Sequence, residues 1–158
     1  MDYQNRIADL MLRQIEAVCR IALAVPEDKR DWTPMGDGRS VMAQLEELAT
    51  VHIHVIPILK TGDAPLITED QKEQIRERKE RLNTFDKLIE GAREGAKLAA
   101  EAIRGVPDSR LEDVVTLHSR GGIKRTMYEM VARPYWNLCY HEGQINYIQM
   151  LLGDTEMH

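Results

Sequence analysis

One histidine near the end of the chain shares its helical face with apolar residues. His141 is spaced from its neighbours by threes and fours, so a helix would turn it toward the same side as an apolar stripe. Asn137 and Gln144 flank it, each about one turn away. A lone histidine on an apolar face is more often a hydrogen-bonded core residue than a ligand. The polar neighbours add a second hypothesis, a binding site. The stripe consists of Met130, Pro134, Leu138, Ile145, Ile148 and Leu152.

A carboxylate has a comparable position earlier in the chain. Glu47 lies beside the core-facing side of another predicted helix, on a stripe that it shares with Ser40, Gln44, Val51 and His54. Helical bundles build metal and ligand sites from polar side chains on facing helices. Imidazole nitrogen and carboxylate oxygen bind ions such as Zn²⁺, whereas a neutral asparagine oxygen is a weaker ligand. We therefore predict one interior site that joins Glu47, His141 and a neighbouring amide side chain.

Other catalytic signatures are absent or incomplete. The pattern H-E-x-x-H begins at His141 but has Ile145 where the second histidine is required. No histidine has a glutamate three residues before it, which disfavours a ferritin-type di-iron centre. The glycine-rich loops that bind nucleotides are missing. Cys139 points away from His141 on a helix, so we interpret it as a structural thiol rather than a nucleophile.

Four apolar stripes at helical spacing must position these residues. They predict helices over residues 2–25, 40–59, 84–105 and 126–152, with Pro57 kinking the end of the second. Small residues dominate the third stripe, so a neighbouring helix can approach it closely. Four helices joined by at least two long connections indicate an all-α four-helix bundle.

The two long connections differ in character. Thr68-Glu69-Asp70-Gln71 is a capping box that opens a charged stretch to about Arg81, which we interpret as solvated helix surface. Residues 108–124 are predicted to be irregular, with a turn at Gly121-Gly122. Another capping box, Thr126-Met127-Tyr128-Glu129, starts the last helix.

Length and charge limit the possible classes of protein. The 158 residues, 43% hydrophobic and 30% charged, are expected to form a single domain over 1–158. A net charge of -5 argues against nucleic acid as a partner. No apolar run is long enough to span a bilayer and no secretory signal is evident, so we expect a cytoplasmic protein without a membrane partner. Cys19 and Cys139 are expected to be free thiols.

The end of the last predicted helix resembles a known family. The segment His141-Glu142-Gly143-Gln144-Ile145, followed by Leu152-Gly153, is similar to the H-x-G-Q-I segment of the DinB/YfiT-like proteins. A second match combines Trp32-Thr33-Pro34, the linker to Ser40 and the helical run ending Glu47-Leu48-Ala49. Together with the bundle layout, the resemblance covers most of the chain.

This resemblance implies an up-down-down-up bundle, often a homodimer, with one divalent metal held by three histidines. The family includes thiol-dependent S-transferases and isomerases that use bacillithiol or mycothiol, and many members have no known activity. The three ligand positions fall on Glu47, Asn137 and His141, so only one keeps histidine. A carboxylate binds Zn²⁺, Ni²⁺ or Mn²⁺ readily, whereas Asn137 lowers the affinity. Gly143 is implied to allow close helix packing, and Gln144 either to orient a neighbouring ligand or to make a plain core contact.

Two functions remain open from the sequence. The first is a divalent-metal-dependent enzyme of the thiol S-transferase type, with a degenerate metal site and a small-molecule substrate or thiol cofactor. The second is a non-catalytic dimeric bundle that has lost its metal and holds an organic ligand or water, in which Glu47 simply pairs with His141. Replacing His141 with alanine separates them, because the first predicts lost metal and the second predicts lost stability.

Overall fold

The computed structural model describes residues 2–118 and 121–158, and six α-helices and one β-hairpin lie within them. Met1 lies outside the described residues, as do Ser119 and Arg120 of the segment predicted to be irregular. Short 3₁₀ turns occur at Glu27–Lys29 and Asp108–Arg110. The helices are α1 (Asp2–Ala24), α2 (Val41–Thr50), α3 (His52–Thr61), α4 (Glu69–Arg81), α5 (Phe85–Arg104) and α6 (Met127–Leu151), and the strands are β1 (Val114–Leu117) and β2 (Ile123–Thr126).

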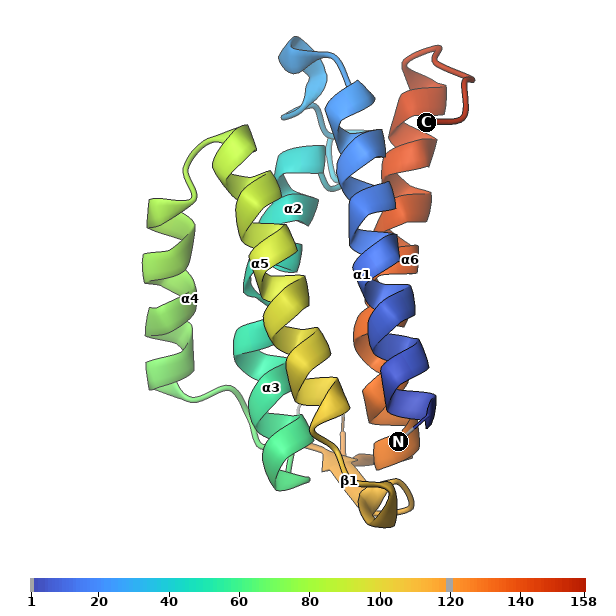
Figure 1. Cartoon of the computed structure of the whole chain (residues 1–158). Coiled ribbons are helices and arrows are strands. Elements are labelled where there is room, and N and C mark those ends of the chain that lie inside the picture. The colour runs from blue at the N-terminus through green and yellow to red at the C-terminus, as the bar shows by residue number, and fades with distance from the viewer. Residues whose placement is uncertain (1, 119–120) are drawn as a thin grey trace.

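The helices of the core follow the predicted up-down-down-up order (Figure 1). Taking α1 as ascending, α2 and α3 descend in line, α5 descends beside them, and α6 ascends beside α1. Two consecutive descending elements need an ascending return between them, and α4 provides it on the outside of the bundle. The all-α four-helix bundle predicted from the apolar stripes is confirmed.

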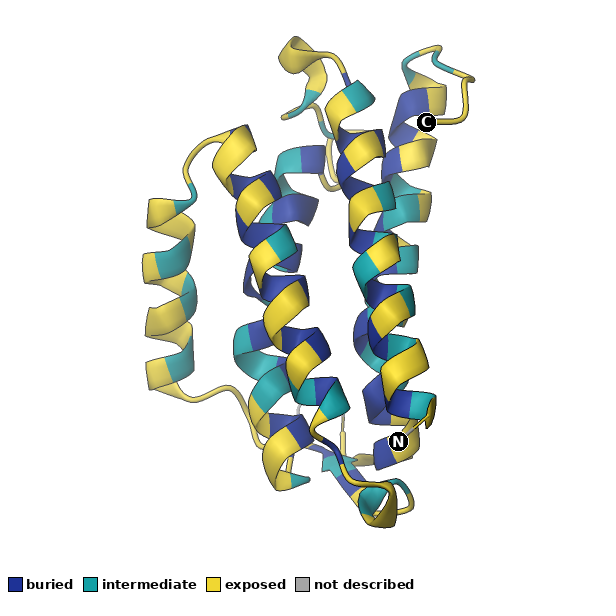
Figure 2. Ribbon diagram, in the orientation of Figure 1, coloured by how far each residue is buried: buried dark blue, intermediate teal, exposed yellow. Residues whose placement is uncertain are grey.

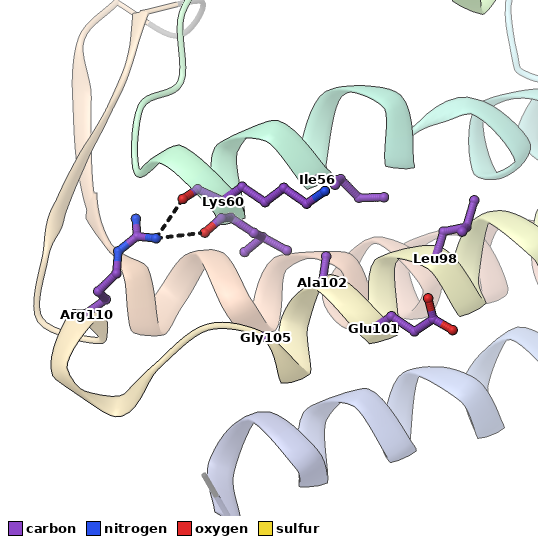
Figure 3. Close-up of a pocket in the computed structure, with 8 residues that line it drawn as sticks. Ile56, Lys60, Leu98, Glu101, Ala102, Gly105 and Arg110 are labelled. Carbon is purple, nitrogen blue, oxygen red and sulfur yellow. Dashed lines mark hydrogen bonds between the residues drawn. The ribbon is translucent and has the colours of Figure 1, made fainter.

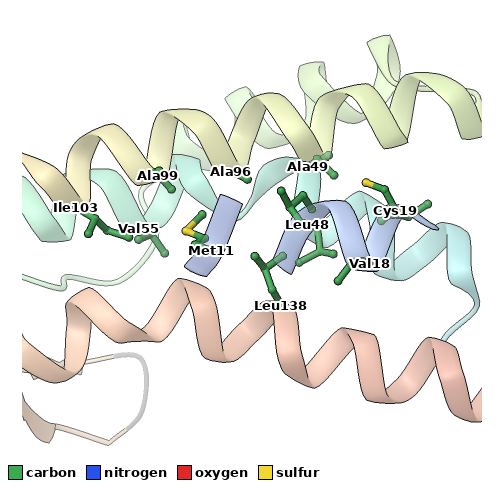
Figure 4. Close-up of a cluster of buried hydrophobic side chains, with 14 of the residues drawn as sticks. Met11, Val18, Cys19, Leu48, Ala49, Val55, Ala96, Ala99, Ile103 and Leu138 are labelled. Atoms are coloured by element: carbon green, nitrogen blue, oxygen red, sulfur yellow. The ribbon is translucent and has the colours of Figure 1, made fainter. Parts of the chain in front are cut away.

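One hydrophobic core fills the space between these helices. The predicted stripes of α1, α2 with α3, α5 and α6 all contribute buried residues to it. Figure 4 shows side chains from these helices meeting there, among them Met11, Leu48, Ala96 and Leu138. Burial is confined to the inward faces, while the outward faces are exposed (Figure 2). The stripe of small residues on α5 lets α2 and α3 pack closely against it, as predicted.

Two glycines of α5 mark the closest approach. A Cβ at Gly95 would lie 2.7 Å from the Nδ1 atom of His52, and a Cβ at Gly91 would lie 2.5 Å from a methyl group of Leu82. Any larger residue at these positions would therefore require the side chain of His52 or of Leu82 to move.

The second predicted helix is divided at Val51, where α2 ends and α3 begins. The hydroxyl of Thr50 donates hydrogen bonds to two carbonyls of the preceding turn, at 2.8 and 3.2 Å, an arrangement that bends helices. The carbonyl of Ala49 accepts from the Nε atom of Arg78, at 2.7 Å. The predicted continuous helix is therefore wrong, because it is interrupted at Val51, while Pro57 lies inside α3.

Helix α4 is tied to the bundle mainly through backbone carbonyls. The capping box predicted at Thr68 is present, and no residue of α4 is buried, which agrees with a solvated helix surface. Besides Ala49, Arg78 contacts the carbonyl of Gly91 at 3.2 Å and the carboxylate of Glu94 at 2.8 Å. Gln71 donates to the carbonyl of Ile53 at 3.4 Å. The residue four positions after Ile53 is Pro57, which has no backbone N–H. The carbonyl of Ile53 therefore has no amide partner within α3.

A β-hairpin replaces the irregular segment predicted before α6. β1 and β2 pair antiparallel, with Val114 opposite Thr126 and Leu117 opposite Ile123, and Gly121 and Gly122 have positive φ angles of 68° and 78°. The predicted turn is therefore confirmed, whereas the absence of regular structure around it is wrong. Leu117 also bridges to Ala64 of the α3–α4 linker, which places the hairpin across the lower end of the bundle. Among the described residues, no helix is long and apolar enough to cross a membrane.

Candidate functional site

The site residues on α2 are positioned by the cap of that helix. Ser40 is the N-cap, and its hydroxyl oxygen accepts a hydrogen bond from the backbone N–H of Ala43 at 3.2 Å. Gln44 and Glu47 follow one turn apart on the same face. Gln44 is buried, and its amide nitrogen donates to the carbonyl of Arg39 at 3.4 Å, which turns its oxygen toward α6.

His141 of α6 lies between these two side chains and is completely buried. Its Nδ1 atom is 3.1 Å from Gln44 Oε1, and its Nε2 atom is 3.2 Å from Glu47 Oε1. Both ring nitrogens therefore face acceptor oxygens. An imidazolium, with two N–H donors, satisfies both of them.

Glu47 connects this buried histidine with the surface. Its side chain is 37% exposed, and its second oxygen accepts a hydrogen bond from the Nη1 atom of Arg39 at 2.5 Å. The hydrogen bond with His141 lowers the pKa of the Glu47 carboxyl to about 2, and Arg39 adds to that effect while partial burial opposes it. Glu47 is therefore a carboxylate at neutral pH, with a cation or imidazole at each oxygen.

A cleft of about 270 Å³ opens beside Glu47, between α3, α6 and the hairpin. Three other polar residues line it: His54, Arg133 and Asn137. Burial, and then the charge of Arg133, lower the pKa of His54, so its imidazole is neutral at neutral pH. The remaining lining residues are apolar: Val51, Val55, Ile58, Ile67, Leu117, Met130 and Pro134.

The structure brings together most of the residues predicted for the site. Glu47 and His141 are in direct contact, and Asn137 lines the same cleft as Glu47. The Nδ2 atom of Asn137 and the Oε1 atom of Gln144 are buried without a hydrogen-bond partner among the described residues. The amide that orients His141 is Gln44, which sequence reasoning placed on the stripe of Glu47 but did not assign to the site.

The expectation for Gly143 differs from the structure. A Cβ at Gly143 would meet nothing within 4 Å, so this glycine is not needed for close helix packing within the chain.

Arg39 was not predicted as a site residue, although its position directly before the cap of α2 places it near Glu47. Cys19 and Cys139 are free thiols as predicted, and burial raises the pKa of the Cys19 thiol to about 11.

The donor set does not fit a tightly held divalent ion. Within residues 2–118 and 121–158, no three His, Cys, Asp or Glu side chains gather as a metal site. One carboxylate and one imidazole remain, and Arg39 already neutralises the carboxylate. Both ring nitrogens of His141 already face oxygens of the protein, Gln44 Oε1 and Glu47 Oε1. Asn137 contributes only a neutral amide.

A larger hollow, of about 450 Å³, lies between α3 and α5 on another side of the bundle (Figure 3). The guanidinium of Arg110 donates there to the carbonyls of Leu59 and Lys60, at 3.3 and 2.8 Å. These carbonyls belong to the last turn of α3, which leaves them without amide partners. Arg110 therefore caps the C-terminal end of α3. None of the predicted site residues lines this hollow.

Comparison with solved structures shows a known fold. The chain is similar to the crystal structure of a DinB-like protein, YjoA, from Bacillus subtilis, with a TM-score of 0.69 and 15% sequence identity. The match covers 97% of this chain and 95% of that chain. No protein-family model matches the sequence, and no curated protein matches it either. The chain therefore has the DinB-like fold, an all-α helical bundle.

Proposed function

We propose that this chain is a non-catalytic binding protein with the DinB-like fold, which holds a small organic molecule in the cleft beside Glu47 without a metal ion. The observation that carries this proposal is the engagement of Glu47 by Arg39 on one oxygen and by His141 on the other. The guanidinium of Arg39 supplies positive charge next to the Glu47 carboxylate. The negative charge of that carboxylate is therefore balanced by the chain itself, without a metal ion.

The protonation states around the cleft also favour binding over catalysis. A general acid or base works best when its pKa lies near the working pH. The pKa of Glu47 is about 2, which makes it a weak base, and the pKa of His54 is lowered. His141 is fully buried and cannot touch a bound molecule. The cleft resembles a small-molecule site, with apolar walls and a few polar groups.

A metal-dependent enzyme of the thiol S-transferase type is the second candidate. It is favoured by one distance, the 3.2 Å between Nε2 of His141 and Oε1 of Glu47. Two ligand atoms that each bind Zn²⁺ at roughly 2.0–2.2 Å can lie about this far apart. On this hypothesis Glu47, Asn137 and His141 would hold Zn²⁺, Ni²⁺ or Mn²⁺ after Arg39 has moved from the carboxylate.

Metal titration and one variant distinguish the two candidates. We expect protein purified without a metal-affinity tag to carry no stoichiometric metal by elemental analysis, and to take up none of Zn²⁺, Ni²⁺ or Mn²⁺ by native mass spectrometry. His141→Ala should lower the free energy of unfolding by about 2–4 kcal/mol in urea, because it leaves a cavity and an unpaired Gln44 oxygen. His118→Ala, at an exposed histidine, is the control and should change it by less than about 0.5 kcal/mol.

The opposite results would support the enzyme. One ion bound per chain, lost in His141→Ala while the unfolding curve of the metal-free protein stays unchanged, would contradict the metal-free proposal.

A further inference from the structure

One buried histidine lies outside the cleft beside Glu47. His52 is the first residue of α3 and is only 7% exposed. Its Nδ1 atom has no hydrogen-bond partner among the described residues, and a Cβ at Gly95 of α5 would lie 2.7 Å from it. An imidazolium donates from both ring nitrogens, and this packing offers Nδ1 no acceptor. The contact between α3 and α5 therefore opposes protonation of His52.

Two charged groups act on this imidazole, one from each of two neighbouring helices. Burial, and then the charge of Arg78 on α4, lower the pKa of His52 to about 4, while the charge of Glu94 on α5 opposes them. Among the described residues, no titratable side chain of α1 or α6 lines the small cavity beside His52. His52 is therefore neutral at pH 7, with one cation and one anion near it.

The same two charged groups hold α4 on the bundle. The Nη2 atom of Arg78 lies 2.8 Å from the Glu94 carboxylate, and Arg78 also donates to the carbonyls of Ala49 and Gly91. Besides these contacts, α4 is tied through an exposed ion pair and a hydrogen bond of 3.4 Å. It buries none of its residues and lies on the outside of the bundle (Figure 1). The attachment of α4 therefore depends strongly on Arg78.

We propose that acid releases α4: when His52 takes up a proton, Glu94 turns from Arg78 to the imidazolium, and α4 leaves the bundle while α1, α5 and α6 stay folded. Two effects act in the same direction. The imidazolium repels the guanidinium of Arg78, and it attracts the carboxylate that Arg78 uses. Glu94 is 62% exposed, so its side chain has room to turn. The proton comes from water, and no covalent bond of the chain changes.

The direction with pH follows from the two states of His52. Its pKa is about 4 with α4 docked, and it returns toward the ordinary value of 6.5 when Arg78 has left. The open state therefore binds more protons than the docked state between these two values. The ratio of open to docked α4 should rise by up to about tenfold per pH unit as the pH falls from 6.5 toward 4. Above 6.5 it should stay constant.

Amide hydrogen exchange of the full chain, corrected for intrinsic rates, measures this opening. Between about pH 7 and about pH 5, amides of α4 should lose protection by about tenfold, while those of α1 and α6 keep theirs. His52→Gln has no titrating ring and should make the protection of α4 independent of pH over this range. His118→Gln, at an exposed histidine, is the matched control and should behave as the wild type.

A second measurement leaves His52 in place, so it still tests the proposal if His52→Gln does not fold. NMR titration of the imidazole signals gives the pKa of His52 directly. Arg78→Met should raise that pKa from about 4 toward 6.5, because it removes the positive charge and loosens α4. Arg76→Met should leave it unchanged, because the ion pairs of Arg76 lie within α4 itself.

Three results would overturn this inference. The first is an equal pH dependence of α4 exchange in wild type and His52→Gln. The second is a parallel loss of protection in α1 and α6, which would mean that acid unfolds the whole bundle. The third is a pKa of His52 that is the same in wild type and Arg78→Met.

Discussion

The arrangement around His141 shows how a buried imidazole is kept fully hydrogen-bonded. Gln44 and Glu47, one turn apart on α2, each present an oxygen to one ring nitrogen. Arg39 lies eight residues before Glu47 and holds its other oxygen from the opposite side. Removing one member of such a chain leaves a polar partner unsatisfied, so the four side chains are expected to act as a unit.

Acid should weaken this unit in a defined pH range. The pKa of Glu47 is about 2 in the folded chain against an ordinary value of 4.5, so its stabilising effect is complete above 4.5 and is lost as the pH falls toward 2. We expect the urea midpoint of the wild type to fall across this window more steeply than that of Glu47→Gln. Glu77→Gln, at an exposed residue of α4, should follow the wild type. Parallel curves for wild type and Glu47→Gln would show that this carboxylate carries no such effect.

The sequence predicted part of this site for a simple reason. Helical spacing alone placed Glu47 and His141 beside the core-facing stripes, and two facing stripes in a bundle meet. The contributions of Gln44 and Arg39 were missed, because which side chain rotates toward the histidine depends on packing that spacing does not record. Whether Asn137, Gln144 or any metal takes part in binding stays a prediction.

At the scale of elements, local patterns predicted helix starts better than helix interruptions. Ser40, Thr68, Thr84 and Thr126 all cap helices through their side chains, and Thr68 and Thr126 belong to capping boxes visible in the sequence. The division at Val51 coincides with a contact from a distant part of the chain, since Arg78 donates to the carbonyl of Ala49. The hairpin was missed because strands of four residues are too short for an alternating pattern to be recognised.

Arg78 should hold α4 against the bundle. Arg78→Met would remove the donors for the carbonyls of Ala49 and Gly91, and we expect amide hydrogen exchange in α4 to accelerate about tenfold or more while α1 and α6 keep their protection. Arg76→Met is the matched control, because the ion pairs of Arg76 lie within α4 itself. Equal exchange in the two variants would mean that α4 is held by other contacts.

At the scale of the whole molecule, the outer face of α6 is unusually apolar. Trp136, Tyr140, Tyr147 and Met150 are each about half exposed or more, with exposed fractions of 56, 48, 59 and 61%. Their spacing, with Gly143 between them, alternates four and three residues, as in the seam between two packed helices. The open space at Gly143 would let a second backbone approach.

We therefore expect a homodimer through this face of α6. Light scattering after size exclusion should give twice the mass of the chain, and Tyr140→Lys should give the mass of one, because a desolvated lysine opposes association. Leu98→Lys, at an exposed leucine of α5, is the control and should remain dimeric. A wild type that runs as a single chain, or a dimer that tolerates Tyr140→Lys, would show that the prediction is wrong.

The outer position of α4 also leaves most of its surface sequence unconstrained by packing. A helix that buries none of its residues can change almost its entire surface as long as it remains helical and water-compatible. The packing of this bundle therefore depends on small and apolar positions of the inner helices and on the few side chains, such as Arg78, that donate to backbone carbonyls. Two chains with 15% identity can therefore have this fold over nearly their full length.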